Sequence, residues 1–225
     1  FVFGDNEWTD CHRFLSGNYD PVERLNFLRQ LFTATNESLG INKIKLMRQG
    51  VIDSKYAAYR ENVYWIYGGV LFAGLNVPGS NNNYGRSDEA NQEYFARNQA
   101  NLAWLEQIFQ LAKQEQIKAI MIIIQANLGF QLPRDHKYRT GFNDFVDHLT
   151  QHVLNTSKNV VLVHGDTHHY RVDQPLKHPK TKMPIKNFTR VETFGSPAEM
   201  NWVNVTVDVT RPEIFTFKPG RPLPH

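Results

Sequence analysis

Two short runs of apolar residues constrain the fold of this chain more than any other feature of its sequence. They are "IKAIMIII" at 117–124 and "NVVLV" at 159–163, each rich in β-branched residues and short for a buried helix. Such runs predict strands that are covered on both faces. An amphipathic pattern at 142–154 predicts a helix between them. Strand, helix and strand in this order form a βαβ unit, so we expect an α/β fold with a parallel sheet.

Turn and cap signals predict further elements on both sides of this unit. Asp20-Pro21 is typical of the start of a helix, and Gly68-Gly69 is typical of a tight reversal between strands. From Arg190 onward, apolar and polar residues alternate, which predicts antiparallel strands with one wetter face. No linker or repeat divides the chain, so residues 1–225 are expected to form a single domain. Helices are expected at 20–32 and 87–114, and strands at 1–3, 61–69 and 70–79.

The charge and hydropathy patterns argue against several classes of function. The net charge is only +3, and the basic residues are scattered except for a proline-containing cluster at 177–182. A nucleic-acid-binding protein would show a basic face, so nucleic acid is not indicated as a partner. No run of about 18 apolar residues occurs, so no membrane span is expected. The single cysteine excludes a disulfide within this sequence and leaves the compartment of a soluble protein open, cytoplasmic or exported.

Four apolar segments each end in a cluster of polar residues. In α/β sheets, ligands bind outside the carboxyl ends of strands, where such clusters converge. Carboxylates, amides and imidazoles together suit a divalent cation. Each cluster taken alone is also common turn chemistry, and the histidines are equally consistent with a surface loop. The clusters are Gly4–Glu7, Pro78–Asn83, Gln125–Asn127 and His164–His169.

The combination resembles the calcineurin-like metallophosphoesterase superfamily, in a divergent, mostly bacterial and uncharacterised branch. "GDNE" at 4–7 stands where the family has G-N-H-[DE], and Gln125 stands at the family's lone histidine. "GDTH" at 165–168 stands on G-H-x-H. The resemblance implies a four-layer α-β-β-α sandwich of which this chain is the C-terminal part. The leading β-α-β unit, with the first two family motifs, would precede Phe1 and would be a missing N-terminal segment of the same protein.

The resemblance also implies two divalent metal ions. Asp5, Gln125 and Asp166 would hold one metal, and His168 would serve the other together with ligands from the missing segment. The first three offer only oxygen, which favours Mg, Mn or Ca over Zn or Fe, although Zn or Fe stays possible. The implied activity is hydrolysis of a phosphate monoester or diester, a phosphatase or phosphodiesterase reaction that uses a metal-activated hydroxide.

The catalytic residues are less defined than the metal ligands. Asn6 stands at the position of the family's general acid, but an amide cannot transfer a proton, so His12, His164 or His169 is expected to replace it. The loss of motif histidines also favours an alternative, a non-catalytic relative that binds a ligand or partner. A hydrolase that uses adjacent Cys11 and His12 is disfavoured, because adjacent side chains point apart. Hydrogen bonds to the phosphoester substrate are expected from Ser80, Asn81 and Asn82.

Overall fold

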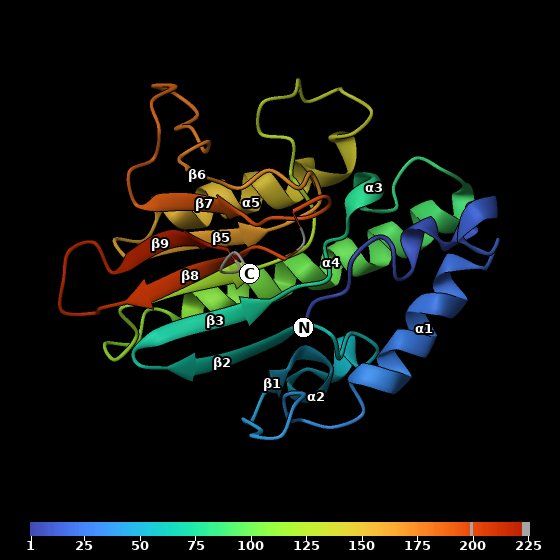
Figure 1. The fold of residues 1–225 in the computed structure, drawn as a ribbon, viewed down its shortest axis with the longest axis horizontal. Coiled ribbons are helices and arrows are strands. Elements are labelled where there is room, and N and C mark those ends of the chain that lie inside the picture. Colours follow the sequence, from blue (N-terminus) through green and yellow to red (C-terminus); the bar gives the residue numbers. More distant parts are fainter. Residues whose placement is uncertain (199, 222–225) are drawn as a thin grey trace.

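A seven-stranded sheet is the central element of the structure (Figure 1). This computed structural model describes residues 1–198 and 200–221. The strand order is β1-β2-β3-β4-β5-β7-β6. Neighbouring strands are parallel from β3 through β4 and β5 to β7, and the pairs at both edges are antiparallel. The predicted α/β class with a parallel sheet is therefore confirmed. The strands are β1 (Met47–Arg48), β2 (Val63–Tyr67), β3 (Val70–Gly74), β4 (Ala119–Ile123), β5 (Asn159–His164), β6 (Arg171–Asp173) and β7 (Phe188–Glu192).

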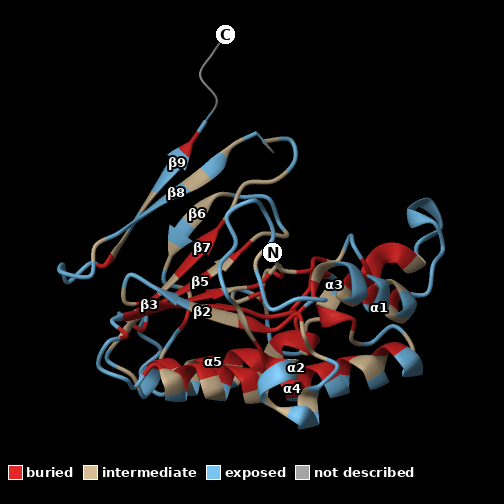
Figure 2. Ribbon diagram, turned by 90° about the horizontal axis from the view of Figure 1, so that it is seen from below, coloured by how far each residue is buried: buried red, intermediate tan, exposed pale blue. Residues whose placement is uncertain are grey.

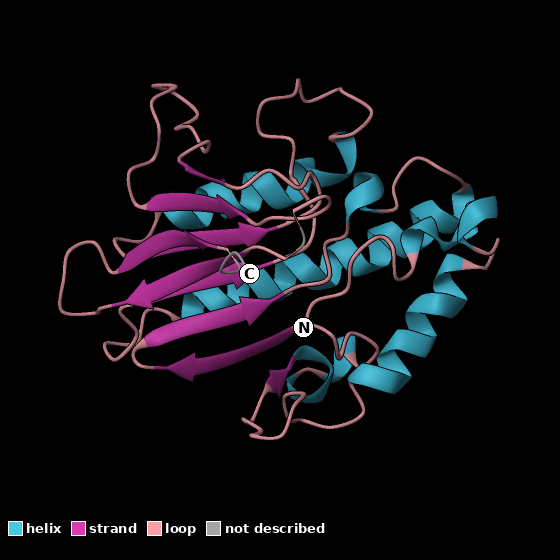
Figure 3. Cartoon of the chain, in the orientation of Figure 1, coloured by secondary structure: helices cyan, strands magenta, loops and turns pink. Residues whose placement is uncertain are grey.

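Two long helices cover one face of this sheet (Figure 2). Trp104 of α4 and Phe145 of α5 are fully buried against the strands, in one cluster with Leu71 and Ile122. This apolar layer is the main core, and its burial is the dominant stabilising term. The other helical segments lie before β1 or in the loops that join the strands (Figure 3). The helical segments are η1 (Thr9–His12), η2 (Phe14–Ser16), α1 (Pro21–Phe32), α2 (Gln49–Ile52), η3 (Ser54–Tyr56), α3 (Gly79–Asn82), α4 (Asp88–Leu111), η4 (Thr140–Phe142) and α5 (Asn143–Leu154).

A hairpin of β8 (Trp202–Val207) and β9 (Phe215–Gly220) forms a second sheet over the opposite face. Its side chains Val203, Phe215 and Phe217 pack on the face that Met121 and Val161 present. The structure thus has two facing sheets, with helices on the outer side of the larger one (Figure 2). Within residues 1–198 and 200–221, no helix covers the outer side of the hairpin. The four-layer sandwich is therefore not confirmed, and three layers are observed.

Two predicted strands differ from the structure. Residues 1–3 form no strand, because β2 and β4 already occupy both edges of β3, the nearest strand. This segment instead packs through its aromatic rings, with Phe1 4.8 Å from Phe32 between ring centroids. The segment 190–192 was expected to be antiparallel and half wet, but it belongs to the buried parallel strand β7. Its polar residues Arg190 and Glu192 are fully buried, and they form ion pairs with Asp173 and Arg171, respectively. The alternation of apolar and polar residues therefore does not mark a solvent-exposed face here.

The other sequence-based elements agree closely with the structure. The reversal at Gly68-Gly69 has positive φ at both residues, 56° and 79°, which glycine adopts without strain. Asp20 caps α1 by accepting hydrogen bonds from the backbone amides of Val22 and Glu23. Among the helices of the described residues, none combines the length and apolar character needed to cross a bilayer.

The turn after β3 has an unusual left-handed backbone. Four consecutive residues other than glycine have positive φ: Ser80 at 50°, Asn81 at 53°, Asn82 at 59° and Asn83 at 64°. This conformation costs roughly 1–2 kcal/mol for an ordinary residue, and less for asparagine, so it normally occurs at isolated positions. Such runs persist only where surrounding contacts determine them.

Arg97 of α4 supplies the contacts that hold this turn. Its guanidinium is 0% exposed and donates five hydrogen bonds, to the carboxylate of Glu93, the backbone carbonyl of Asn76, and both the side chain and backbone oxygens of Asn82. It also lies 5.1 Å from the ring centroid of Trp8. All five N–H donors of the side chain are therefore used, so the cost of burying the charge is offset.

Replacing this arginine tests its structural role. Arg97→Met is expected to lower the free energy of unfolding by about 3–5 kcal/mol, since it removes the cationic partner of the Glu93 carboxylate and the donors to both oxygens of Asn82. Arg134→Met is the matched control, because its ion pair with Asp147 is exposed, with side chains 59% and 44% accessible. That control should cost less than about 1 kcal/mol. Urea unfolding measures both, and similar small losses in the two variants would contradict the assigned role.

Candidate functional site

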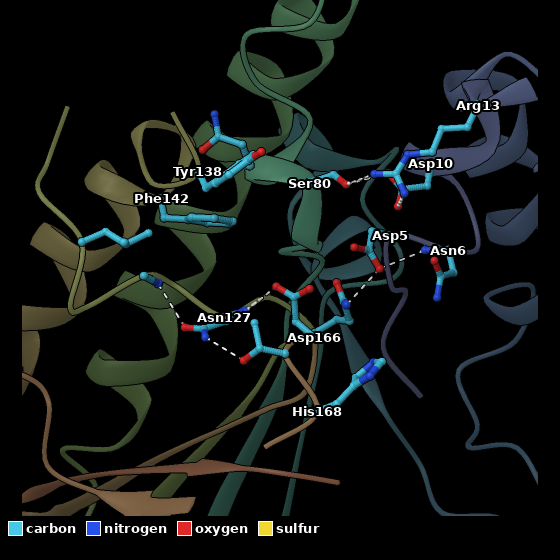
Figure 4. Close-up of a pocket in the computed structure, with 15 residues that line it drawn as sticks. Asp5, Asn6, Asp10, Arg13, Ser80, Asn127, Tyr138, Phe142, Asp166 and His168 are labelled. Atoms are coloured by element: carbon cyan, nitrogen blue, oxygen red, sulfur yellow. Dashed lines mark hydrogen bonds and ion pairs between the residues drawn. The ribbon is translucent and has the colours of Figure 1, made fainter. Parts of the chain in front are cut away.

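A cavity of ≈ 510 Å³ opens at the carboxyl ends of β3, β4 and β5 (Figure 4). The turn after β3 and the segments after β4 and β5 each contribute to it, as does the N-terminal segment. Parallel strands bring these segments to one edge, which is where α/β proteins bind ligands. The polar residues of its lining are Asp5, Asn6, Asp10, Arg13, Ser80, Asn81, Gln125, Asn127, Tyr138, Asp166, Thr167 and His168.

Asp5 and Asp166 form the acidic centre of this cavity. Both carboxylates reach Gly79: a Cβ atom there would lie 2.3 Å from Asp5 Oδ2 and 2.9 Å from Asp166 Oδ1. The missing side chain of Gly79 is therefore what lets both carboxylates approach the turn. Burial, followed by repulsion from Asp166 and Asp10, raises the pKa of Asp5 to about 6. Burial also raises the pKa of Asp166. Both shifts indicate carboxylates that a bound cation would stabilise in their charged form.

Gln125 orients Asp5 and does not offer its oxygen to the cavity. Its Oε1 accepts a hydrogen bond from the backbone amide of Gly79, and its Nε2 donates to Asp5 Oδ1 at 3.0 Å. The backbone donor fixes which end of the amide faces Asp5, since only the oxygen can accept from an N–H. The expectation that Gln125 is an oxygen ligand is therefore corrected: its NH₂ group faces the acidic centre.

His168 lines the cavity, and one hydrogen bond orients its ring. Its Nδ1 lies 3.1 Å from the carbonyl oxygen of Ser196, which can only accept, so Nδ1 is the donor. A histidine held in this way can bind a cation or carry a proton. Asn6 lines the same cavity, and its backbone amide donates to Asp5 Oδ1 at 3.0 Å.

The fit of these residues to a metal ion is partial. Across the described residues, no group of three or more His, Cys, Asp or Glu side chains is placed to hold a metal ion. The two-metal arrangement with His168 as a ligand is therefore not assembled by them. Mg²⁺, however, binds through one or two carboxylates and keeps several waters. The pair Asp5 and Asp166 fits a hard cation of that kind.

Three residues that the sequence indicated do not line the cavity. Asn82 is 0% exposed and uses its side chain on Arg97 and the carbonyl of Gly141. His164 is 1% exposed and points toward the helix-covered face, as its strand neighbour Leu162 does, and burial lowers its pKa. The side chain of His169 is exposed outside the cavity. None of the three is assigned a role in chemistry or substrate binding.

The side chain of Asn81 has a structural role although the residue lines the cavity. Its Nδ2 donates to the carbonyl of Tyr84 and to Thr140 Oγ1, each at 3.0 Å, and its Oδ1 accepts from Gly141 N. These contacts use both amide hydrogens, so they join the turn to the loop before α5. The side chain is not free to bind a substrate, in contrast to the sequence-based expectation.

Sequence reasoning missed three residues of the cavity wall. Asp10 is buried, pairs with Arg13 at 2.8 Å and accepts a hydrogen bond from Ser80 Oγ at 2.5 Å. Arg13 also donates to Ser80 Oγ at 3.3 Å, and Tyr138 lies on the side of Ser80 away from Arg13 in the view of Figure 4. The spacing of Asp10 and Arg13 on one helical turn was the available signal. Tyr138 lies in a long loop, and no local pattern marks it.

Comparison with known proteins gives a distant structural likeness. No family model matches the chain, and no curated protein matches it. The solved structure of PhoD superposes with a TM-score of 0.41 and 13% identity. The match covers 61% of this chain and 29% of the PhoD chain. A likeness at this level does not bear on function, so the conclusions below depend on the geometry of the site.

The raised pKa of Asp5 predicts a pH-dependent stability in protein stripped of divalent cations. Between the ordinary value of 3.8 and about 6, the folded state keeps a proton that the unfolded state releases, so stability falls as the pH rises. Asp5→Asn, which mimics the protonated carboxyl, should therefore raise the thermal midpoint above pH 6. The gain should vanish below pH 3.8.

Thermal unfolding in a chelator across this pH range measures the effect. Asp208→Asn is the control of opposite sign, because hydrogen bonds from Thr210 lower the pKa of Asp208. It should lose stability at neutral pH. A gain for Asp5→Asn that is the same at all pH values would show that Asp5 does not titrate as described.

Proposed function

We propose that the cavity binds a phosphoester together with a divalent cation and catalyses hydrolysis of the ester. The observation that carries the proposal is the convergence of Asp5 and Asp166 on Gly79, with raised pKa values, at the carboxyl ends of parallel strands. Two buried carboxylates favour a cation, and a cation with open positions favours a phosphate oxygen. The resemblance of "GDNE" and "GDTH" to metallophosphoesterase motifs supports the same class of substrate.

The residues around this centre have separate proposed roles. Asp5 and Asp166 would hold the cation, which when bound would neutralise charge on the phosphate oxygens. Gln125 keeps Asp5 in place through its NH₂ group. Arg13, fixed by Asp10 at the rim, is positioned to attract the anionic ester. His168 is the one histidine in the cavity lining of the described residues, and we assign it the proton transfer.

A second function, binding without turnover, is favoured by a specific observation. Gln125 has its oxygen engaged, and the described residues contain no group of three metal-binding side chains. In this alternative, a single cation and an anionic ligand bind in the cavity, and no ester is hydrolysed. Turnover separates the two functions.

Asp166→Asn tests the hydrolase directly. Asparagine keeps the shape of aspartate and tolerates the positive φ of 76° at this position, so the fold should persist. With Mg²⁺ or Mn²⁺, the wild-type protein should hydrolyse an aryl phosphate monoester or diester. We expect Asp166→Asn to lower kcat/KM by about 10²-fold or more, because a group that stabilises transition-state charge is removed.

The thermal midpoint with and without Mn²⁺ is measured beside the kinetics, because it reports cation binding independently of turnover. Added Mn²⁺ should raise the thermal midpoint of the wild-type protein and of the control Asp208→Asn, which lies outside the cavity, but not of Asp166→Asn. No turnover by the wild-type protein, with the Mn²⁺ shift retained, would favour binding without hydrolysis. If Asp166→Asn keeps the full rate of hydrolysis and the full rise of the thermal midpoint with Mn²⁺, Asp166 is not part of the cation site.

A further inference from the structure

A second cavity of ≈ 310 Å³ adjoins the first, and we call it the annex. The two share a wall made by Asp10, Arg13, Ser80, Asn81 and Tyr138. The hydrogen bonds and ion pair among Asp10, Arg13 and Ser80 therefore stand between the acidic centre and the annex. A molecule that lies across this wall would contact both cavities.

The annex carries an excess of positive charge. Arg86 and Lys137 line it in addition to Arg13, and Asp10 is the one carboxylate in its lining. Within the described part of the chain, neither Arg86 nor Lys137 has a carboxylate within ion-pair distance. Four acids that make no ion pair with Arg86 still attract it, namely Asp20, Asp10, Glu93 and Glu89.

Both cations are held by neighbouring groups. Arg86 donates from Nη2 to Asn83 Oδ1 at 2.8 Å, and Asn83 in turn donates to Glu93, so the left-handed turn fixes this wall. The ammonium of Lys137 lies 4.8 Å from the ring centroid of Tyr138 on the shared wall. Arg86 keeps further N–H donors for a ligand, and Lys137 keeps its three.

We propose that the annex binds a second anionic group of the substrate, so that the substrate is a phosphoester with a further phosphate-type charge beyond the reacting one. This inference rests on the proposed function, because it assumes that the reacting phosphate lies at Asp5 and Asp166. Guanidinium and ammonium groups on a concave wall recognise phosphate-type oxygens through charge-assisted hydrogen bonds. An ester with a neutral leaving group would leave the annex unused and would bind less tightly.

Binding of phosphonates tests the proposal without any turnover, since their carbon–phosphorus bond resists hydrolysis. The measurement is isothermal titration calorimetry in Mg²⁺ with methylphosphonate and with α,ω-alkane bisphosphonates of increasing length. In the wild-type protein, the best-fitting bisphosphonate should bind about tenfold or more tightly than methylphosphonate, since charge-assisted hydrogen bonds are strong. The double variant Arg86→Gln/Lys137→Gln should lose this preference.

The control removes the same charge elsewhere. Lys180→Gln/Arg211→Gln alters two exposed residues outside both cavities, so it should keep the bisphosphonate preference. Arg86 and Lys137 are exposed, and the thermal midpoint of the annex variant is measured beside the binding, because Arg86 also donates to Asn83 of the left-handed turn. A preference that is absent from the wild-type protein, or unchanged in the annex variant, overturns the proposal.

The failures of the two proposals are distinguishable. A bisphosphonate preference that depends on Arg86 and Lys137, without hydrolysis of any aryl phosphate, contradicts the hydrolase and keeps the annex. Hydrolysis of aryl phosphate without a bisphosphonate preference contradicts the annex alone. Failure to bind methylphosphonate and every bisphosphonate, without turnover, contradicts both.

Discussion

The buried guanidinium of Arg97 determines the shape of the site. Its five hydrogen bonds join α4 to Asn76 at the end of the β3 strand segment and to Asn82 in the left-handed turn. Its contact with the Trp8 ring adds the N-terminal segment to the same assembly. Because a buried, fully bonded arginine has few alternative positions, the turn keeps an otherwise unfavourable backbone. Gly79 and Ser80 thereby acquire fixed positions beside the carboxylates.

The site combines several features that lower stability and suit function. The left-handed turn costs backbone energy, and the paired carboxylates repel one another in a partly buried environment. Neither feature helps the fold, so a gain elsewhere must offset them. The apolar layer between the sheet and helices α4 and α5 provides that gain. A cation bound by Asp5 and Asp166 would relieve the repulsion, which couples ligand binding to stability.

The sequence predicted those features that depend on local patterns. The parallel strands, the Gly68-Gly69 reversal and the Asp20 cap of α1 follow from residue spacing and turn chemistry, and the structure agrees. The position of Ser80 and Asp166 in one cavity follows from strand ends that meet at one edge, whereas Asp5 reaches it from a segment that forms no strand. Side-chain orientation did not follow, because it depends on tertiary partners.

Particular residues show why those predictions failed. Gln125 was expected to offer oxygen, but the nearby N–H of Gly79 takes that oxygen. Arg190 and Glu192 were expected on a solvent-exposed face of a strand, but ion pairs allow both side chains to be buried. Asn82 was expected to bind substrate, but Arg97 donates hydrogen bonds to both its side-chain and its backbone oxygen. In each case a partner far along the chain decided the outcome.

The most direct test of the central claim is anomalous diffraction from crystals of the protein grown with Mn²⁺. The account predicts a manganese peak within coordination distance of carboxylate oxygens of both Asp5 and Asp166, in the cavity beside Gly79. Mn²⁺ is a suitable probe because it accepts the same oxygen donors as Mg²⁺ and scatters anomalously. An empty cavity at saturating Mn²⁺, with peaks confined to other surface carboxylates, would contradict the claim that these two residues form a cation site.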